Sequence, residues 1–472
     1  MADRRPNVLF LLTDQERADL AAPDGLPVDT PNLDRLRSSG VWFDRAYTTT
    51  SICTSARASL LTGLYPHAHG MLNNSHGADA IRTELPPDLP TFGERLRESG
   101  YDNTYVGKWH VDQRRGPSGF GFEYVGGDGV REHRTEDDDV AFGESALQDR
   151  IYTGGEDPTL VAATTTTPPE ETLTARLTDR TIEALRRHAG DESTPFFHRT
   201  DFLGPHFPYV VPEPYASMYD PEDVERWPTY AETFEEKPRV HENYHRYRGV
   251  ADFDWATWAE AIAKYFGFMT FIDEQIGRLL DALERFDLAD STAVVHASDH
   301  GDFAGSHRQF NKGPLMYEDT YRIPLIVSHP GGSAAGTRSS AFVRLQDLMP
   351  TFLEWADVSI PEGLHARSVV PLLEGDRPGD WPDSVYAQYH GDEFGLYSQR
   401  MVRTDRYKFV FNAPDRDELY DLAADPHELH NVADHPEYRG VREALGGRLA
   451  EWMERVDDPL RGWAPQALEI DR

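Results

Sequence analysis

The stretch Asn7-Val8-Leu9-Phe10-Leu11-Leu12-Thr13-Asp14 is apolar on both faces and ends in a carboxylate. Such runs are typical of strands that are buried on both sides, as in parallel sheets covered by helices. Thr292 to Ser298 repeats the pattern and ends at Asp299, and Ile323 to Ser328 is a third run. Because functional side chains gather at the carboxyl ends of such strands, Asp14 and Asp299 are expected at one edge of a sheet.

Helices and strands are predicted to alternate along the rest of the first three quarters of the chain. One helix should begin with Thr30 as N-cap and Pro31 in its first turn, and end before Gly40. Alternation of this kind predicts an α/β fold, with a large, mostly parallel sheet flanked by helices. The further predicted helices cover 89–99, 171–189 and 258–286, and the further strands 41–47, 101–106 and 195–202.

The pattern changes from about residue 376 onward. Three short strands with turns between them are predicted at 384–390, 396–403 and 407–412, followed by a helix at 437–455. We therefore expect a catalytic domain at 1–375 and a smaller C-terminal subdomain at 376–472, with an antiparallel sheet and a helix. Two stretches before it, 125–170 and 205–256, are predicted to be irregular segments near the site or the surface.

The composition is strongly acidic and poor in lysine. The formal net charge is −34, which makes a nucleic-acid partner unexpected. Lysine occurs only at 108, 237, 264, 312 and 408, and such surfaces resemble those of proteins from halophiles that accumulate salt. Because no apolar run is long enough for a signal peptide or a membrane span, a cytoplasmic protein with no membrane partner is expected.

The sequence Cys53-Thr54-Ser55-Ala56-Arg57 carries the strongest chemical signal. Cys53 is the only cysteine, so it forms no internal disulfide, and it precedes a helix-like segment that ends at Gly63. A helix N-terminus favours an anion or an activated nucleophile, and Arg57 lies one turn later, where it can bind an oxyanion. The alternative is a buried cysteine that acts only as a small apolar side chain.

This motif, followed by Leu60-Leu61-Thr62-Gly63, resembles the signature of the sulfatase family, whose fold is alkaline-phosphatase-like. The resemblance implies that a maturation enzyme oxidises Cys53 to formylglycine, whose hydrate attacks sulfur. Ser55 stands where the family usually has Pro or Ala. The run from Glu418 to Asn431 resembles the C-terminal subdomain of sulfatases, so the likeness extends over the whole chain.

Two acidic turns are candidates for holding one divalent metal. Asp14, Gln15 and Asp299 supply the oxygen ligands that hard cations prefer. The resemblance implies that His300 and, once converted, Cys53 complete the set. Gln15 and His300 in these places resemble choline sulfatases and phosphonate monoester hydrolases. Ca²⁺ is the expected metal, and the histidine keeps Mn²⁺ as an alternative.

Further elements resemble the sulfate-binding parts of the family. The resemblance implies that Lys108 and Lys312 hold sulfate oxygens and that His110 contacts the hydrated aldehyde. His206 is the expected general acid, since imidazole titrates near neutral pH, and Lys312 is its rival. Asn74 is expected to bind the ester. The three histidines at 67, 69 and 76 are interpreted as pocket or surface residues rather than metal ligands.

The sequence therefore predicts a sulfuric ester hydrolase that acts on a small-molecule or saccharide sulfate. One alternative is a phosphonate monoester or phosphodiester hydrolase on the same fold. Lys108 and His110 argue against it, because that branch resembles a Tyr/Thr pair at these places. A second alternative is a pseudo-sulfatase whose Cys53 stays a thiol and which only binds an anion.

Overall fold

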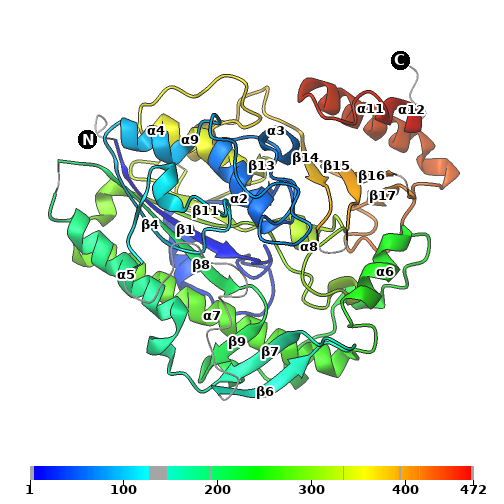
Figure 1. The fold of residues 1–472 in the computed structure, drawn as a ribbon, viewed down its shortest axis with the longest axis horizontal. Coiled ribbons are helices and arrows are strands. Elements are labelled where there is room, and N and C mark those ends of the chain that lie inside the picture. Colours follow the sequence, from blue (N-terminus) through cyan, green and yellow to red (C-terminus); the bar gives the residue numbers. More distant parts are fainter. Residues whose placement is uncertain are drawn as a thin grey trace.

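The computed structural model describes residues 5–126, 146–191, 193–332, 334–392, 395–413 and 415–468. Its centre is an eight-stranded sheet (Figure 1). In spatial order the strands are β12 (Thr337–Ser339), β2 (Val41–Phe43), β11 (Leu325–Ser328), β10 (Thr292–Ser298), β1 (Asn7–Asp14), β8 (Phe196–Pro205), β4 (Asp102–Gly107) and β5 (Glu123–Tyr124). Only β11 runs antiparallel to its neighbours, so the expected mostly parallel sheet is confirmed.

The register of the three central strands brings polar residues to one edge. β1 pairs with β10 from Asn7 opposite Thr292 to Thr13 opposite Ser298, and on its other side Asp14 lies opposite Pro205. Since the three strands are parallel, Asp14, Asp299 and His206 leave the sheet at the same end. This is the edge that the apolar runs ending in Asp predicted.

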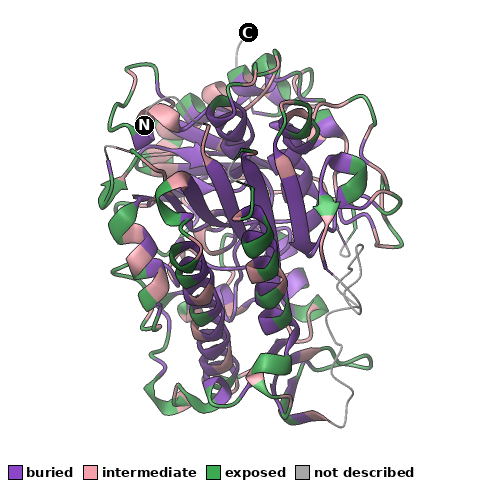
Figure 2. Ribbon diagram, turned by 90° about the vertical axis from the view of Figure 1, so that its left-hand side faces the viewer, coloured by how far each residue is buried: buried purple, intermediate pink, exposed green. Residues whose placement is uncertain are grey.

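Side chains of β1 alternate between two apolar cores, as the period of a strand requires. Leu9 and Leu11 pack in the core that contains helices α1 (Pro31–Ser39), α5 (Leu173–His188) and α7 (Trp255–Arg285). Val8, Phe10 and Leu12 pack in the core that contains α2 (Cys53–Thr62), α4 (Phe92–Glu98) and α9 (Leu348–Trp355). In Figure 1 α5 and α7 lie on one side of the sheet and α2, α4 and α9 on the other, and in Figure 2 its strands are almost entirely buried. The continuous apolar run in β1 therefore follows from helices on both faces.

Helix lengths agree with the predictions in most places. The helices of the catalytic part are α1 (Pro31–Ser39), α2 (Cys53–Thr62), α3 (Pro66–His69), α4 (Phe92–Glu98), α5 (Leu173–His188), α6 (Arg239–Tyr247), α7 (Trp255–Arg285), α8 (Glu318–Tyr321), α9 (Leu348–Trp355) and α10 (Val370–Leu373). Thr30 precedes α1, but its side chain makes no capping bond. The carboxylate of Asp273 in α7 accepts the N–H groups of Asn32 and Leu33 instead.

The C-terminal part forms a separate antiparallel sheet, as predicted, but with four strands instead of the expected three. Its strands are β14 (Ser384–Tyr389), β15 (Ser398–Thr404), β16 (Tyr407–Ala413) and β17 (Glu418–Asp421), in that order. Helices α11 (Arg439–Arg455) and α12 (Ala464–Ala467) follow, and Leu449, Trp452 and Met453 of α11 pack with Val402 and Phe409 of the sheet. The domain boundary at 375/376 stays a prediction.

Some expected elements were wrong in detail. The strand expected at 41–47 is interrupted at Asp44 and Arg45, and its second part, β3 (Ala46–Tyr47), pairs with β13 (Val343–Arg344). Outside 127–145, the segments 125–170 and 205–256 are less irregular than expected, because β6 (Leu147–Tyr152), β7 (Leu160–Thr165) and β9 (Tyr209–Pro212) form a three-stranded sheet. β3 and β9 pair with strands that are distant in the sequence, and local patterns do not show such pairings. The acidic run at 136–139 lies outside the described residues.

Candidate functional site

Helix α2 begins at Cys53 and points its N-terminus at the carboxyl edge of the central sheet. All ten of its residues are buried, and it ends at Gly63, whose left-handed backbone (φ 71°) lets its N–H bond to Ser59 O. Cys53 is fully buried. Its Sγ lies 3.1 Å from Nε2 of His300 and 4.0 Å from Oδ1 of Asp14. The helix thus delivers the one cysteine to the ends of β1 and β10.

Four of the predicted metal ligands converge. Ligand atoms of Asp14, Cys53, Asp299 and His300 all lie within 4.8 Å of one another, and it is the only such group among the described residues. His300 Nδ1 lies 2.9 Å from Gly301 O, which makes Nδ1 the donor and leaves the lone pair of Nε2 toward the cluster. Two carboxylates, an imidazole with a free lone pair and the side chain at position 53 fit a divalent cation.

Arg57 is surrounded by three aspartates. Its Nε donates to Asp299 at 2.8 Å, one terminal nitrogen donates to Asp201 at 2.8 Å, and the other donates to Asp14 at 3.0 Å. All four groups are fully buried. Because every nitrogen of Arg57 already donates to a carboxylate, it holds the carboxylates in place. In this structure it does not present an open fork to an oxyanion.

Burial and neighbouring charges lower the pKa values of Asp14 and His300 and raise that of Cys53. Burial alone raises the pKa of Asp14, but the neighbouring positive charges, that of Lys108 foremost and that of Arg57 as well, hold it well below its ordinary range. Burial, reinforced by Asp14, raises the pKa of the Cys53 thiol well above its ordinary value. Burial lowers the pKa of His300 to about 4. At neutral pH the centre therefore contains a carboxylate, a neutral imidazole and a protonated thiol.

Lys108 reaches the same carboxylate from β4. Its Nζ lies 2.9 Å from Oδ2 of Asp14. Gly107, the last residue of β4, has φ 106°, and a Cβ there would lie only 1.9 Å from Asp201 O. Only glycine allows the chain to turn this closely against β8, so the glycine places Lys108 at the site.

Lys312 and His206 form a second pair beside Gln15. Lys312 Nζ lies 2.7 Å from His206 Nε2 and donates to Oε1 of Gln15 at 3.1 Å. The amide nitrogen of Gln15 donates to Asp302 at 2.6 Å. Gln15 and Asn311 both have left-handed backbones, with φ of 63° and 68°, and residues other than glycine adopt this conformation mainly where the surroundings impose it.

His110 and Asn74 lie on the side of the site formed by 73–76. His110 Nε2 contacts Nδ1 of His76. Asn74 Oδ1 accepts the N–H of Thr54, the residue after Cys53, while its amide nitrogen donates to Asp392 from the C-terminal part. Both ends of the Asn74 amide are therefore engaged. The histidines at 67, 69 and 76 lie outside the four-ligand group, and their interpretation as pocket or surface residues stays a prediction.

Comparisons with known proteins agree with this geometry. The family model described as Sulfatase matches residues 6–358, and the one described as N-sulphoglucosamine sulphohydrolase, C-terminal, matches residues 305–455. The chain belongs to the sulfatase family. The sulfatase assignment that the Cys53 motif predicted is confirmed, and the protein is a sulfuric ester hydrolase.

The relatives of this sulfatase include several activities. It is 30% identical to an arylsulfatase of Clostridium perfringens (95% of each chain), 27% to an N-acetylglucosamine-6-O-sulfatase of Bacteroides thetaiotaomicron (96% of this chain, 87% of the other) and 28% to a choline-sulfatase of Rhizobium meliloti (98% and 90%). Among solved structures, a phosphonate monoester hydrolase from Silicibacter pomeroyi superimposes with a TM-score of 0.81 at 27% identity, over 96% of each chain. The predicted nearness to the choline sulfatase and phosphonate monoester hydrolase branch is thereby confirmed.

Sequence reasoning missed two aspartates that support the site of this sulfatase. Asp201 holds Arg57 and is itself paired with Arg199 at 2.6 Å, and Asp392 holds Asn74. One signal was available: Arg199 and Asp201 are charged residues inside a strand that is buried throughout. The individual roles of the site residues remain predictions. Among the described residues, every helix is too short or too polar to cross a bilayer.

Proposed function

We propose that this sulfatase hydrolyses a sulfate monoester of a sugar or small alcohol, using a formylglycine made from Cys53 and one divalent metal, Ca²⁺ favoured and Mn²⁺ the alternative. The observation that carries the proposal is the convergence of Asp14, Cys53, Asp299 and His300 within 4.8 Å at the N-terminus of α2. A bound divalent cation at this place supplies positive charge next to a sulfate oxygen.

The state of the thiol supports conversion of Cys53. Cysteine is a nucleophile as the thiolate, yet burial and Asp14 raise the pKa of Cys53 well above its ordinary value. An unmodified side chain would stay protonated and unreactive at neutral pH. Formylglycine, when present, supplies as its hydrate a hydroxyl that can attack sulfur. We propose that a formylglycine-generating maturation enzyme acts on this chain, as the resemblance implies.

The surrounding side chains have complementary roles in the proposed reaction. Lys108, 2.9 Å from Asp14, and Lys312 supply positive charge to the sulfate oxygens. Arg57 acts through the three aspartates that it binds, and so keeps the carboxylates fixed around position 53. His110 is proposed to contact the hydrated side chain at position 53, and Asn74 to lie beside the ester.

The leaving-group proton is proposed to come from the His206–Lys312 pair. The ammonium of Lys312 donates to Nε2 of His206, 2.7 Å away, so one proton lies between the two side chains. A proton on Nε2 of His206 is in position to pass to the departing alcohol oxygen as the sulfur–oxygen bond breaks. Lys312 then remains the rival donor, because it holds the same proton in this structure.

The substrate class is argued from the relatives. The N-acetylglucosamine-6-O-sulfatase and the choline-sulfatase are named for a sugar sulfate and for a small-alcohol sulfate, respectively. The likeness to a phosphonate monoester hydrolase favours phosphonate or phosphodiester hydrolysis as the second candidate. Rates on an aryl sulfate and on an aryl phosphonate, measured with the same preparation, discriminate the two. A higher kcat/KM for the phosphonate would overturn the sulfatase proposal.

The mass of the intact chain tests conversion directly. Formylglycine is about 18 Da lighter than cysteine, and a converted chain gives no reaction with a thiol reagent. Cys53→Ala should abolish turnover and leave the melting temperature close to that of the parent. Appreciable sulfatase activity in that variant would contradict the role of position 53. A full-mass, thiol-reactive chain would support the anion-binding pseudo-sulfatase instead.

A further inference from the structure

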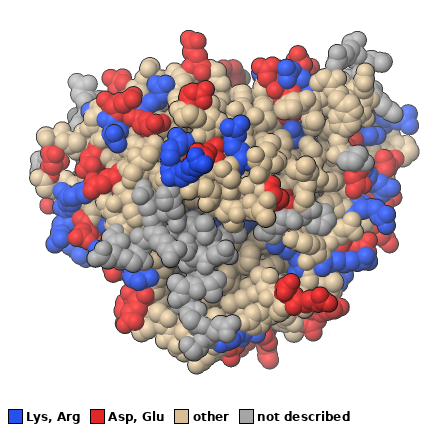
Figure 3. Space-filling model, viewed as in Figure 1, with Lys and Arg blue, Asp and Glu red and all other residues tan. Residues whose placement is uncertain are grey.

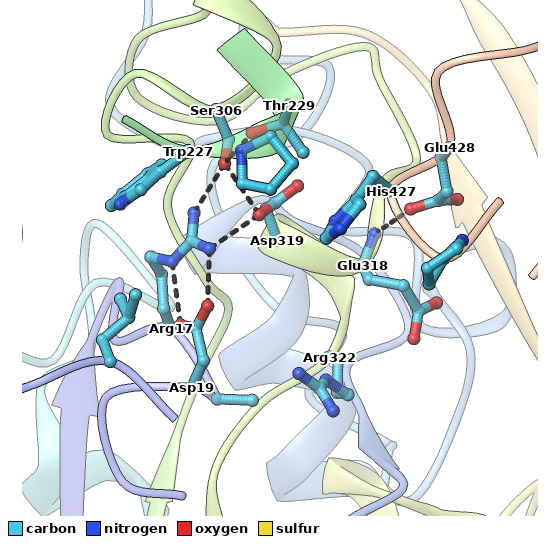
Figure 4. A pocket seen from close by; sticks show the side chains of 14 residues that line it. Arg17, Asp19, Trp227, Thr229, Ser306, Glu318, Asp319, Arg322, His427 and Glu428 are labelled. Atoms are coloured by element: carbon cyan, nitrogen blue, oxygen red, sulfur yellow. Dashed lines mark hydrogen bonds and ion pairs between the residues drawn. The ribbon is translucent and has the colours of Figure 1, made fainter. Parts of the chain in front are cut away.

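Arg17 lies three residues beyond Asp14, and its side chain is only 6% exposed. It contacts side chains from four separate segments (Figure 4). Its Nε and one terminal nitrogen donate to the two oxygens of Asp19, at 2.9 and 2.6 Å, and the same terminal nitrogen lies 2.8 Å from Asp319. Its guanidinium also lies 4.4 Å from the ring centroid of Trp227.

The remaining terminal nitrogen of Arg17 reaches the segment that follows β10. It donates to Asp302 O and Phe303 O, each at 3.2 Å, and to Oγ of Ser306 at 3.1 Å. These acceptors begin only three residues after Asp299. Arg17 thus ties the carboxyl end of β1, where Asp14 and Gln15 lie, to the segment after β10, which carries Asp299 and His300.

A second hydrogen bond, between Gln15 and Asp302, joins the same two segments. The side chain of Asp302 accepts from the amide of Gln15 at 2.6 Å, while its backbone carbonyl accepts from Arg17. Tyr265 of α7 holds the backbone of Gln15 and Arg17, because its hydroxyl donates to Gln15 O and accepts the N–H of Arg17. These hydrogen bonds lie outside the four-ligand group and join the two ligand-bearing segments, in addition to the pairing of β1 with β10 and the bonds of Arg57 to Asp14 and Asp299.

We propose that Arg17 is a positioning residue for the metal centre, holding the ligands after β1 and β10 at the separation that a divalent cation requires. This inference rests on the proposed function, since it presupposes a metal beside position 53. Arg17 acts through the backbone of 302–303 and does not contact the ligand atoms. Groups that orient metal ligands from outside commonly change affinity or activity by about 10- to 100-fold when removed.

Lysine is a poor substitute at this position. The planar guanidinium of Arg17 donates from all three nitrogens in fixed directions, whereas an ammonium has three donors at one point on a flexible stem. Arg17→Lys keeps the charge near Asp19 and Asp319 but loses the fixed bonds to the carbonyls of Asp302 and Phe303. We expect this variant to fold and to bind metal more weakly.

The cavity shown in Figure 4 offers a sharper test. It has a volume of about 290 Å³ and is lined by Arg17, Asp19, Trp227, Ser306 and Asp319, among others. In Arg17→Ala this cavity would extend into the space left by the side chain. Guanidinium ions added to the solution then have a route to the vacated place between the two aspartates, where they can restore the missing donors.

The experiment measures Mn²⁺ binding by electron paramagnetic resonance on chelator-stripped, formylglycine-containing protein, together with the melting temperature. The variants are Arg17→Lys, Arg17→Ala and the milder Ser306→Ala, which removes one acceptor of Arg17. Arg344→Lys and Arg344→Ala are matched controls, because Arg344 pairs with Asp347 at 2.9 Å and lies over the ring of Tyr65. Guanidinium chloride at tens of millimolar is compared with NaCl at equal ionic strength.

We expect the dissociation constant for Mn²⁺ to rise about 10-fold or more in Arg17→Lys and Arg17→Ala, and less in Ser306→Ala. Guanidinium, and not NaCl, should restore part of the affinity of Arg17→Ala. Parent-like affinity in all three variants, or an equal loss in the Arg344 controls, would overturn the inference while leaving the metal centre intact. If the parent protein binds no Mn²⁺, the same variants are compared for Ca²⁺ binding by calorimetry, and a parent that binds neither ion would overturn the metal centre and the inference together.

Discussion

At the scale of single residues, His206 and Lys312 compete for one role, since their nitrogens lie 2.7 Å apart. A general acid matters most for a poor leaving group, because a good one departs without a proton. His206→Ala should therefore slow hydrolysis of an alkyl or sugar sulfate by about 10²-fold or more, and that of a nitrophenyl sulfate far less. Steady-state kcat for the two substrates checks this.

Lys312→Ala is the matched control for that prediction. If Lys312→Ala shows the steep dependence on the leaving group and His206→Ala shows none, the two roles are exchanged. If neither variant shows it, the proton comes from elsewhere, and the assignment of this side of the site is wrong.

Buried His69 should make the free energy of unfolding depend on pH. It is fully buried, and its Nδ1 accepts the N–H of Met71 at 3.1 Å. Burial lowers its pKa to about 3. In the unfolded chain a histidine titrates near pH 6.5, so below that pH only the unfolded state takes up the proton. Stability is therefore lost as the pH falls from about 6.5 toward 3, by about 1.4 kcal/mol per pH unit for this residue.

The variant His69→Gln isolates this contribution, because the amide oxygen can still accept from Met71 and does not titrate. Urea unfolding at pH 6.0, 5.0 and 4.5 should give a shallower loss of unfolding free energy for the variant than for the parent. Equal slopes for the two proteins would show that His69 takes up its proton in the folded state.

Site residues at the ends of strands could be predicted from the sequence, whereas those that act through distant elements could not. Asp14 is the last residue of β1, and His206 and Asp299 directly follow β8 and β10, so their common edge was predictable from local apolar patterns. Asp201 lies inside β8 and acts through Arg57, on another element. Its role depends on the pairing of β8 with β1 and β4, which no local stretch encodes.

At the scale of elements, α2 lacks a cap of its own. Ile52 precedes it and has no polar side chain, so the N–H of Thr54 is accepted by Asn74 at 3.3 Å. Asp392 holds Asn74 through both the backbone N–H, at 3.2 Å, and the side-chain amide, at 3.1 Å. The C-terminal part of the chain thus supports the helix that carries Cys53.

Exchanging this pair tests the support. Asn74→Asp alone places a second carboxylate next to that of Asp392, and the two repel each other. Its cost in unfolding free energy should therefore exceed that of a lost helix cap, which is about 1 kcal/mol. The double variant Asn74→Asp with Asp392→Asn restores one donor and one acceptor, and should regain part of the loss. Urea unfolding of the two single variants and the double variant measures the coupling. Strictly additive losses would mean that the two residues act independently.

Local sequence patterns predicted some helices and strands well and others poorly. Long or strongly apolar elements such as α7 and β10 were predicted within a few residues, because their periodicity is complete within one stretch. Thr30 was a reasonable cap by residue type, yet Asp273 in α7 accepts the N–H groups at the start of α1. Short strands such as β3 and β9 form only because partners that are distant in the sequence complete them.

At the scale of the whole molecule, the net charge of −34 should make stability depend on salt. Figure 3 shows acidic side chains distributed around this face, with basic ones between them. Added salt shortens the reach of their repulsion, from a Debye length of about 10 Å at 0.1 M to about 3 Å at 1 M. The melting temperature should rise from dilute to molar KCl. A flat or falling curve would contradict this prediction.

Finally, the five lysines have a common placement. Those at 108, 237, 312 and 408 are buried, and Lys264 is partly buried and donates to Thr164. Lys237 lies against the rings of Tyr317 and Tyr420, and Lys408 pairs with Glu318 and Glu428. Reagents that acylate side-chain amines would consequently find almost no target on the folded protein. Fluorescent labels, cross-linkers and solid supports would have to be attached through its plentiful carboxylates instead.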